Sequence, residues 1–467
     1  MKKSLLWLVV LVLSISMVAT FSLAGCKKEE AAVAEEEEAV VEEEVTIEEE
    51  VEEPVAEELT LTVWTYDYSP YADFLNSAFE EYENLHPNVT IDYVYLPFGD
   101  YADALVTQLA AGAGPDVFVG WDVWFADFLD KGLLDIADYN ALGYGSLEEM
   151  ADDFPGDSWK MCATEDNAYG VVEHLNSLLF FINNEQFREV GLDPETDFPK
   201  TWDDVIEVGK KLVIRDDDGG FVREGLDFIQ DVPENVAIVS QIFYAQAGAE
   251  WFNEDMTECL LNSPEAIKAM SVVNSIINEN EIGSPHYGNI DPTAHHFDWQ
   301  QGHQSMVLGN PTVELLAEQY LGAGNYTIGQ MPQMRDGVRE ATSGWGWFWA
   351  VNPATNKNTE SWKLVDFITS YDPVRFYDDI KAFMVRNYHE WTNDPAADAI
   401  KTEFWDEWWE SFETVVYPPQ TTINTEAFNA NYKAFQLIVN EGVDVEEALN
   451  QAKEEIDAAL RRAGYAE

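Results

Sequence analysis

Apolar and polar positions alternate at residues 59–64, which predicts a β-strand, because successive side chains of a strand point to opposite faces. A helical spacing follows, since Phe74, Ala78, Phe79 and Tyr82 fall on one face of a helix. His-Pro-Asn at 86–88 breaks this helix. Residues 89–94 then alternate again and predict a second strand.

The same pattern repeats once more along the chain. Residues 101–111 have helical spacing that ends at Gly112 and Gly114, and residues 115–119 predict a third strand. This order of strands and helices is typical of an α/β protein with a mostly parallel, doubly wound sheet. Sheets of this kind bind ligands at the carboxyl ends of their strands, so the residues after each strand are the first candidates for a site.

The first 25 residues have a different pattern. Lys2 and Lys3 precede an almost wholly apolar run at 5–21, and Leu-Ala-Gly-Cys follows at 23–26. A short positive start, an apolar stretch and small residues predict an export signal at 1–25. The run 23–26 resembles the bacterial lipobox, which implies that Cys26 is lipidated and anchors the protein to a membrane. An uncleaved membrane anchor is the alternative.

Residues 26–58 predict a disordered linker behind Cys26. From residue 29 onward the segment consists mainly of glutamate, alanine and valine, and it has no aromatic residue. Such a segment buries too little apolar surface to offset the entropy of ordering it, and its like charges extend it. It serves either as a tether for the rest of the chain or as a solvating spacer.

The composition of the chain constrains its partners. The sequence has 88 acidic and 25 basic residues, a formal net charge of −63. This charge argues against nucleic acid, whose phosphates bind Lys and Arg. It is compatible with a saline habitat, a cationic ligand or a need for solubility. Cys162 and Cys259 are the cysteines that remain after Cys26, and sequence alone does not show whether they form a disulfide.

Motifs of catalysis, cofactor binding and metal binding are mostly absent. The sequence has no Gly-x-Ser-x-Gly, no phosphate-binding loop, no Cys-x-x-Cys and no His-Glu-x-x-His, so we expect no cofactor. The acidic run at 215–220 lacks the end ligands of a calcium loop and predicts a turn. His295, His296, Asp298 and His303 form a metal-like cluster, but surface or core histidines are the favoured interpretation, so we expect no metal site.

Several separated stretches resemble the extracellular solute-binding proteins of ABC sugar importers, the group that includes maltose-binding protein. The matching segments are GPDVF at 114–118, KGLLD at 131–135, FFINNEQF at 180–187, VGLD at 190–193, PKTWDD at 199–204, QGHQSM at 301–306, GWGW at 344–347 and WKLVDF at 362–367. Each segment alone is weakly specific, but their order and spacing together identify the chain as similar to this family over nearly the whole body.

The resemblance implies a type II periplasmic-binding-protein fold, a clamp of two discontinuous lobes. The expected lobes are 59–177 with 345–388, and 178–344 with 389–467, and the chain should cross between them near 176–180, 341–345 and 385–395. The solute lies in the cleft, and hinge closure buries it. The resemblance also implies an extracytoplasmic monomer that delivers its solute to the transmembrane subunits of an ABC permease.

A sugar site needs carboxylates and amides for hydrogen bonds and aromatic rings for the apolar faces of the sugar. The candidates after predicted strands are Tyr66, Asp67, Tyr68, Asp100, Tyr101, Trp121, Asp122, Glu173 and His174. The candidates that the resemblance adds are Asn176, Asn310, Trp345 and Phe428. Thr312 stands where the maltose-binding branch has a stacking tryptophan, which argues against a malto-oligosaccharide ligand.

Plain packing is the alternative for many of these aromatic residues. Trp64, Trp124 and Trp347 are candidates for the core, because alternation turns every second strand residue away from a cleft. Residues 405–409 hold three tryptophans at helical spacing, which favours packing over ligand contact. Two other functions remain open: a secreted glycoside hydrolase using Asp67 with Asp122, and the same clamp binding a polyamine or another cation.

Overall fold

The structure is a computed structural model that describes residues 58–227, 232–284, 299 and 301–466. The predicted signal segment, Cys26 and nearly all of the 26–58 linker lie outside the described residues, as do His295, His296 and Asp298. None of the helices that the structure describes is long and apolar enough to cross a bilayer.

The strands are β1 Leu59–Tyr66, β2 Val89–Leu96, β3 Val117–Trp121, β4 Val171–Ser177, β5 Leu179–Asn183, β6 Ile214–Arg215, β7 Phe221–Asp227, β8 Gln304–Gly309, β9 Tyr326–Gly329, β10 Thr342–Val351, β11 Phe383–Met384 and β12 Val415–Val416. The α-helices are α2 Ser69–Leu85, α3 Phe98–Ala110, α4 Phe125–Asp130, α5 Leu147–Ala151, α6 Asn184–Glu189, α7 Trp202–Leu212, α8 Pro233–Ala247, α9 Pro264–Asn274, α11 Pro311–Tyr320, α12 Asn358–Ile368, α13 Pro373–Ile380, α14 Tyr388–Trp391, α15 Trp405–Thr414, α16 Asn424–Glu441 and α17 Val445–Ala463. The short helical turns are η1 Asp122–Trp124, η2 Ser158–Cys162, η3 Ser275–Glu279 and η4 Ala397–Ala399.

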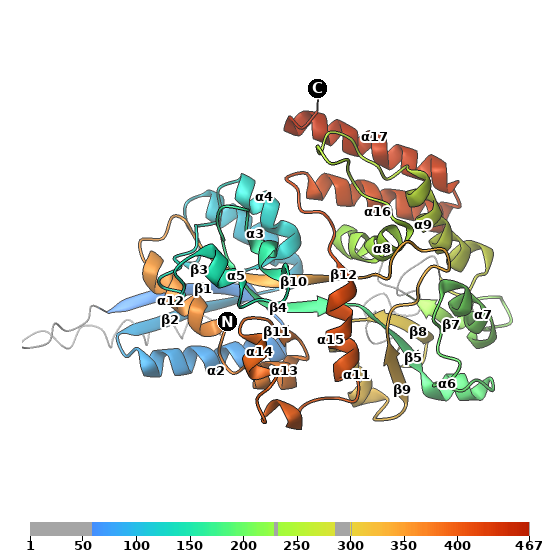
Figure 1. Ribbon diagram of the computed structural model, residues 1–467, viewed down its shortest axis with the longest axis horizontal. Helices are drawn as coiled ribbons and strands as arrows, with labels where there is room; N and C mark the ends of the chain where they lie inside the picture. Colours follow the sequence, from blue (N-terminus) through green and yellow to red (C-terminus); the bar gives the residue numbers. More distant parts are fainter. Residues whose placement is uncertain (1–57, 228–231, 285–298, 300, 467) are drawn as a thin grey trace, which may run out of the picture. The chain divides into compact units, whose positions relative to one another are not determined.

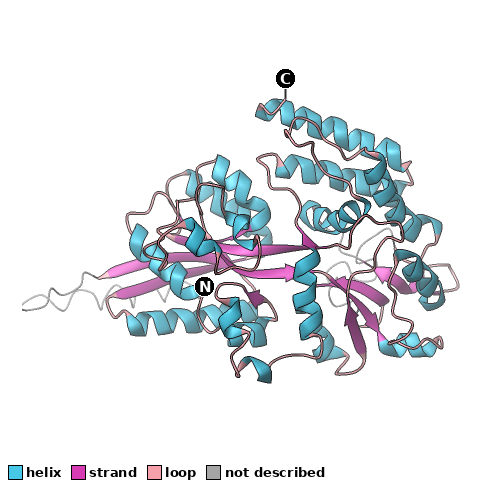
Figure 2. Cartoon of the chain, viewed as in Figure 1, coloured by secondary structure: helices cyan, strands magenta, loops and turns pink. Residues whose placement is uncertain are grey.

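The described strands form two sheets (Figures 1 and 2). The larger has the order β11-β4-β10-β3-β1-β2, with β12 paired to β10, and the smaller has the order β6-β7-β8-β5-β9. In the larger sheet β1 is parallel to both β2 and β3, which confirms the parallel pattern predicted from residues 59–119. β10 returns antiparallel between β3 and β4. The smaller sheet departs from the expected parallel order, because three of its pairings are antiparallel.

Helices cover both faces of the larger sheet. In Figure 1, α2 and α13 lie on one side of it, and α3 and α4 lie on the other. Burial alternates along β1: Leu61 and Val63 point to one face and are fully buried in the core that contains Tyr71 and Phe74 of α2, whereas Trp64 on the other face is only partly buried. The helices α8, α9, α16 and α17 pack together beside the smaller sheet.

The chain passes from one sheet to the other more than once. β4 and β5 belong to different sheets and are separated only by Leu178, as the expected crossing near 176–180 requires. β9 and β10 also belong to different sheets, so a second crossing lies between them, as expected. The third connection is longer than the predicted 385–395, because β12 still pairs with β10 through Thr342↔Val415 and Ser343↔Val416.

The Gly-Pro-Asp segment at 114–116 has a structural role. The Asp116 carboxylate accepts hydrogen bonds from the backbone and hydroxyl of Thr62, from the Thr355 hydroxyl and from the Lys357 ammonium. Burial alone would raise the pKa of Asp116, but these hydrogen bonds outweigh it and lower the pKa. One ionised carboxylate therefore joins β1 to the segment that follows β10.

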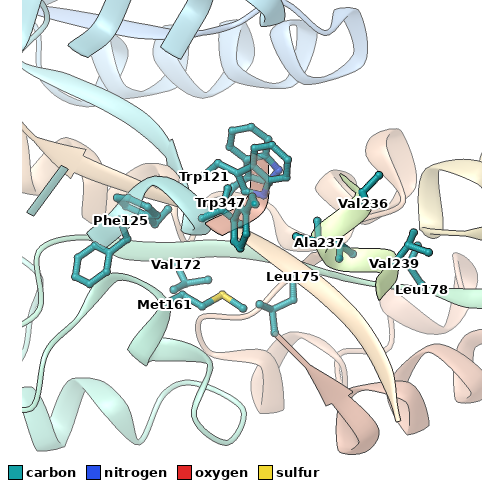
Figure 3. Packing of buried hydrophobic residues seen from close by; sticks show 14 of the residues in the cluster. Trp121, Phe125, Met161, Val172, Leu175, Leu178, Val236, Ala237, Val239 and Trp347 are labelled. Carbon is teal, nitrogen blue, oxygen red and sulfur yellow. The ribbon is translucent and has the colours of Figure 1, made fainter. Parts of the chain in front are cut away.

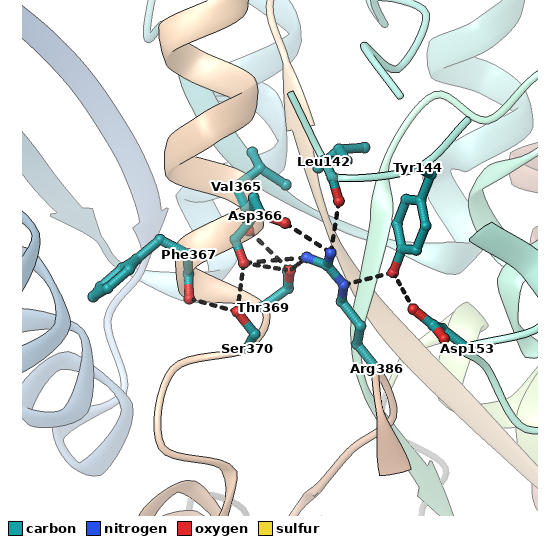
Figure 4. A network of polar contacts seen from close by, with 9 residues as sticks. All are labelled: Leu142, Tyr144, Asp153, Val365, Asp366, Phe367, Thr369, Ser370 and Arg386. Atoms are coloured by element: carbon teal, nitrogen blue, oxygen red, sulfur yellow. Dashed lines mark hydrogen bonds and ion pairs between the residues drawn. The ribbon is translucent and has the colours of Figure 1, made fainter. Parts of the chain in front are cut away.

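A second buried polar network holds the loop before α5 against α12 (Figure 4). The Arg386 guanidinium donates to the Tyr144 hydroxyl and the Leu142 carbonyl, and it pairs with the Asp366 carboxylate at 2.7 Å. It also donates to the Thr369 hydroxyl. These hydrogen bonds satisfy several N–H donors of Arg386. The fold can therefore bury the positive charge of this side chain almost fully.

Candidate functional site

Aromatic side chains gather where the parallel strands β1 and β3 end. Tyr66 is the last residue of β1 and Trp121 the last of β3. Trp347 of β10 lies directly opposite Trp121 in the antiparallel register. Its ring is 4.5 Å from that of Tyr66 and stacks on that of Trp121 at 5.6 Å with an interplanar angle of 15°. The sheet topology therefore brings together three rings from distant parts of the sequence.

Phe98 completes this cluster, and sequence reasoning missed it. It is the first residue of α3, two positions after β2 ends, and it is 47% exposed. Its ring lies 5.8 Å from Tyr66, 6.1 Å from Trp121 and 6.1 Å from Trp347. The signal for it was an aromatic residue four positions after the predicted strand 89–94. We call Tyr66, Phe98, Trp121 and Trp347 the aromatic platform.

Two hydrogen-bonding atoms at the end of β3 have no partner among the described residues. They are the indole nitrogen of Trp121 and one carboxylate oxygen of Asp122. Buried polar atoms without partners are uncommon and mark places where a ligand or water completes the bonding. The Trp121 nitrogen belongs to the platform and can donate to a sugar hydroxyl group, whereas Asp122 is 1% exposed and lies near Cys162 and Tyr417.

Asp122 is itself almost fully buried, because the short turn η1 folds it back beside β10. Burial raises the pKa of Asp122 to about 7, although hydrogen bonds from the backbone N–H groups of Gly346 and Val123 act to lower it. The side chain also lies near Cys162 and Tyr417, whose pKa values its charge helps to raise. A carboxyl group in this setting changes charge near neutral pH.

The Asp122→Asn variant is expected to remove a pH dependence of stability. The folded pKa of about 7 exceeds the ordinary 3.8, so the stabilising contribution of Asp122 is complete below about pH 3.8 and is lost as pH rises through 7. Relative to the wild type, the variant should gain up to about 4 kcal/mol of unfolding free energy between acid and mildly alkaline pH. Urea denaturation at a series of pH values measures this, and parallel curves for the two proteins would contradict it.

Thr312, in the helix that follows β8 of the smaller sheet, contacts Tyr68 close to the platform. The Tyr68 hydroxyl hydrogen-bonds with Thr312 of α11, which follows β8; burial raises the pKa of Tyr68 and this hydrogen bond lowers it in part. Asn310 lies immediately before α11, and its side-chain oxygen accepts the backbone N–H of Val313 at 3.3 Å. Tyr68 and Thr312 thus bring the two sheets' sides together beside the platform.

The remaining candidates divide into exposed and buried positions. Asp67 and Asp100 are exposed, and Trp345 is half-buried. Asn176 is buried in β4, opposite Trp345.

Tyr101 and Glu173 support the platform from within the core. Tyr101 is fully buried, and its hydroxyl donates to the carbonyl groups of Val119 at 2.7 Å and Trp64 at 3.1 Å. Glu173 is also fully buried and accepts hydrogen bonds from the Tyr71 hydroxyl and, at 2.7 Å, from the Trp349 indole. Neither side chain has exposed surface with which to contact a solute in this structure.

His174 and Phe428 are likewise buried. The imidazole Nδ1 of His174 lies 2.8 Å from a Glu173 oxygen. Phe428 lies on α16, where its ring packs 5.7 Å from Trp251, among the helices beside the smaller sheet.

The other aromatic predictions have mixed outcomes. Trp347 belongs both to the core and to the platform, while Trp64 and Trp124 are half-buried against the core. Trp405 and Trp408 of α15 are buried, which confirms packing for them, whereas Trp409 is only partly buried.

Cys162 and Cys259 are both buried and free, so they form no disulfide. Residues 216–220 form the predicted turn between β6 and β7. Within the described residues no group of three or more histidine, cysteine or acidic side chains could hold a metal ion.

Comparison with known proteins shows to which family this chain belongs. The sequence profile of one family, described as bacterial extracellular solute-binding protein, matches residues 68–374. The chain belongs to this family. Its members are binding proteins, and the solute-binding fold accounts for two sheets joined by several crossings.

Three similar proteins illustrate the relationship. The lactose-binding protein of Rhizobium radiobacter is 24% identical over 345 residues, which cover 68% of this chain and 72% of that protein. A solute-binding protein of Thermotoga lettingae, solved with α-D-tagatose, has a TM-score of 0.73 at 21% identity and covers 86% of this chain and 99% of its own. The maltose-bound MalE3 of T. maritima has a TM-score of 0.73 at 18% identity, with coverages of 86% and 100%. These two structures establish the two-lobed fold of this solute-binding protein.

Proposed function

We propose that this solute-binding protein captures a carbohydrate on the aromatic platform and delivers it to an ABC importer. The observation that carries the proposal is the cluster of Tyr66, Phe98, Trp121 and Trp347 with ring separations of 4.5 to 6.1 Å. Aromatic faces of this kind bind the apolar C–H faces of sugar rings. The Trp121 N–H, which has no partner among the described residues, supplies a donor for sugar hydroxyl groups.

The ligands of similar proteins support a sugar as the solute. Lactose and α-D-tagatose appear in the names of two of the proteins described above, and maltose in that of the third. An arabinooligosaccharide-binding protein of Halalkalibacterium halodurans is also 25% identical over 235 residues, which cover 48% of this chain and 49% of that protein. The solutes differ in size, so their shared feature is the polyhydroxylated ring.

The proposal includes a division of the chain into two lobes. One lobe comprises 59–177 and 345–388, and the other comprises 178–344 and 389–467. The separate sheets and the single residue Leu178 between β4 and β5 support this division. A solute drives closure of such a clamp only through its extra affinity for the closed form.

The proposed surroundings of the protein follow from its first residues and from the family. Cys26 carries a lipid that holds the monomeric protein to the outer side of a bacterial membrane, and the transmembrane subunits of the permease receive the solute from it. The Leu-Ala-Gly-Cys run at 23–26 supports the lipid anchor.

Within the site we assign different roles to the candidates. The platform rings contact the solute, and Asp67, Tyr68, Asp100, Asn176, Asn310 and Trp345 offer polar or aromatic groups around it. Tyr101, Glu173, His174 and Phe428 position other side chains, since they are buried and engaged with protein atoms or packed in the core.

A thermal-shift screen tests the proposal. Lactose, maltose and tagatose are compared at concentrations far above their dissociation constants, where a bound ligand adds about 2.7 kcal/mol of stability at 100 times that constant. At least one sugar is expected to raise the melting temperature, and no chromogenic glycoside should be hydrolysed.

The formal net charge of −63 suggests a second candidate solute, a cation such as spermidine, because a strongly negative protein attracts cations. Salt distinguishes the two, because charge attraction is screened whereas stacking on a neutral sugar is not. A shift produced by spermidine at low salt only, with none from any sugar, would refute carbohydrate binding.

A further inference from the structure

A cavity of about 840 Å³ lies on the other face of the larger sheet from the aromatic platform. Leu175 of β4 lines it. A Cβ added at Gly346 would lie 3.2 Å from a Leu175 methyl group, whereas the neighbouring Trp347 points to the opposite face. Figure 3 shows this division, with Trp121 and Trp347 on one side of the crossing strands and Met161 and Leu175 on the other. The cavity and the platform are therefore separate places in the molecule.

The walls of this rear cavity come from α15, β12, α14 and residues 155–158. Its aromatic lining residues are Tyr388, Trp409, Phe412 and Tyr417. The rings of Tyr388 and Trp409 stack at 5.8 Å with an interplanar angle of 24°, and those of Trp409 and Phe412 lie 5.5 Å apart. The cavity thus has ring surface in fixed positions, which suits the apolar face of a small ligand.

Two polar groups of the lining have no hydrogen-bond partner among the described residues. Ser158 is 5% exposed and its hydroxyl is unpaired, and the indole nitrogen of Trp409 is buried and unpaired. Ser158 lines the cavity, and its hydroxyl can both donate and accept a hydrogen bond. The Trp409 indole can only donate, so its missing partner must be an acceptor.

The charge of the lining narrows the class of ligand. Asp157, Glu410 and Glu413 line the cavity, and none of its lining residues is Lys or Arg. These carboxylates repel an anion and accept hydrogen bonds from hydroxyl groups. A simple cation would satisfy the carboxylates but would leave the Trp409 donor unpaired. Only a ligand that both donates and accepts fits all of these groups.

We propose that the rear cavity is a second binding site of this protein, which takes a neutral polyhydroxylated compound of mono- or disaccharide size. Ring faces of Trp409 and Phe412 contact the C–H faces of the ligand. Its oxygens accept from the Trp409 indole and the Ser158 hydroxyl, and its hydroxyl groups donate to Glu410 and Glu413. The site does not depend on the platform, since the two lie on different faces of the sheet.

Saturation-transfer NMR with methyl α-D-glucoside and sucrose as probes tests the second site. The measurement uses the Trp121→Ala protein, in which binding at the platform is impaired. Both probes are expected to show transfer at millimolar concentration. Adding Trp409→Phe, which keeps a ring but removes the N–H, or Ser158→Ala should weaken probe binding about tenfold.

The control is Trp159→Phe in the same background, because Trp159 is half-buried next to Ser158 but does not line the cavity. It should leave probe binding unchanged. Absence of transfer in the Trp121→Ala protein overturns the second site, and so does equal binding by the Trp409→Phe and Trp159→Phe variants. Displacement of both probes by tetramethylammonium would show that the cavity binds a cation, and this result would also overturn the proposed second site. Binding at the platform is scored separately, from the wild-type melting temperature.

Discussion

Replacing Trp121 with alanine is expected to abolish the rise in melting temperature that a bound sugar produces. Trp121 stacks on Trp347, contacts Phe98 and carries the unpartnered indole N–H, so its removal takes away ring surface and a donor at once. Losses of this kind at the centre of a binding site commonly exceed about 2 kcal/mol, which is at least about thirtyfold in affinity. Isothermal titration with the best sugar of the thermal-shift screen measures the change.

Two further variants are informative. One distinguishes the contribution of the Trp121 ring from that of its N–H, and the other tests whether the loss of any aromatic side chain has the same effect. Trp121→Phe keeps a ring on the platform but has no donor, and it should weaken binding by about tenfold. Tyr93→Ala deletes an aromatic side chain of β2 that is 42% exposed and has no contact with the platform rings, and it should bind sugar normally. If the Trp121→Ala protein keeps its full ligand-dependent stabilisation while folding normally, the platform is not the binding site.

The position of this site could be predicted from the sequence because its physical basis is local. The patterns at 59–64, 89–94 and 115–119 predicted three strands, which the structure places at Leu59–Tyr66, Val89–Leu96 and Val117–Trp121. Neighbouring parallel strands end at one edge of the sheet, and the rings of Tyr66 and Trp121, both among the sequence candidates, both contact Trp347 there. Phe98 was not among the candidates because it lies four positions beyond the predicted strand 89–94.

Contacts between distant segments could not be predicted in the same way. Glu173 and His174 were expected after a strand but lie within β4, and Trp347 joins Trp121 only because β10 returns antiparallel between β3 and β4. The turn η1 likewise buries Asp122, although an acidic residue after a strand suggests an exposed one. Burial of this kind depends on the tertiary fold, which alternation does not encode.

Glu173 shows how far such long-range contacts change the role of a residue. Sequence position suggested a ligand-binding carboxylate, but in the structure Tyr71 of α2 and Trp349 of β10 donate to it from 102 and 176 positions away. It therefore positions the strands beneath the platform, and Tyr66, which stacks on Tyr71 at 5.5 Å, lies directly above this network.

Replacing Glu173 with leucine is accordingly expected to lower the unfolding free energy by about 3–5 kcal/mol, because two buried donors lose their acceptor with no water to replace it. Glu173→Gln retains an amide oxygen for the Trp349 indole and should lose only about 1–2 kcal/mol. Glu165→Leu, at an exposed loop position, provides the matched control and should change stability by less than about 0.5 kcal/mol. Guanidinium denaturation without ligand measures all three. Equal, small losses for Glu173→Leu and Glu165→Leu would mean that the buried carboxylate does not hold β4, β10 and α2 together, and the platform would then owe its geometry to packing alone.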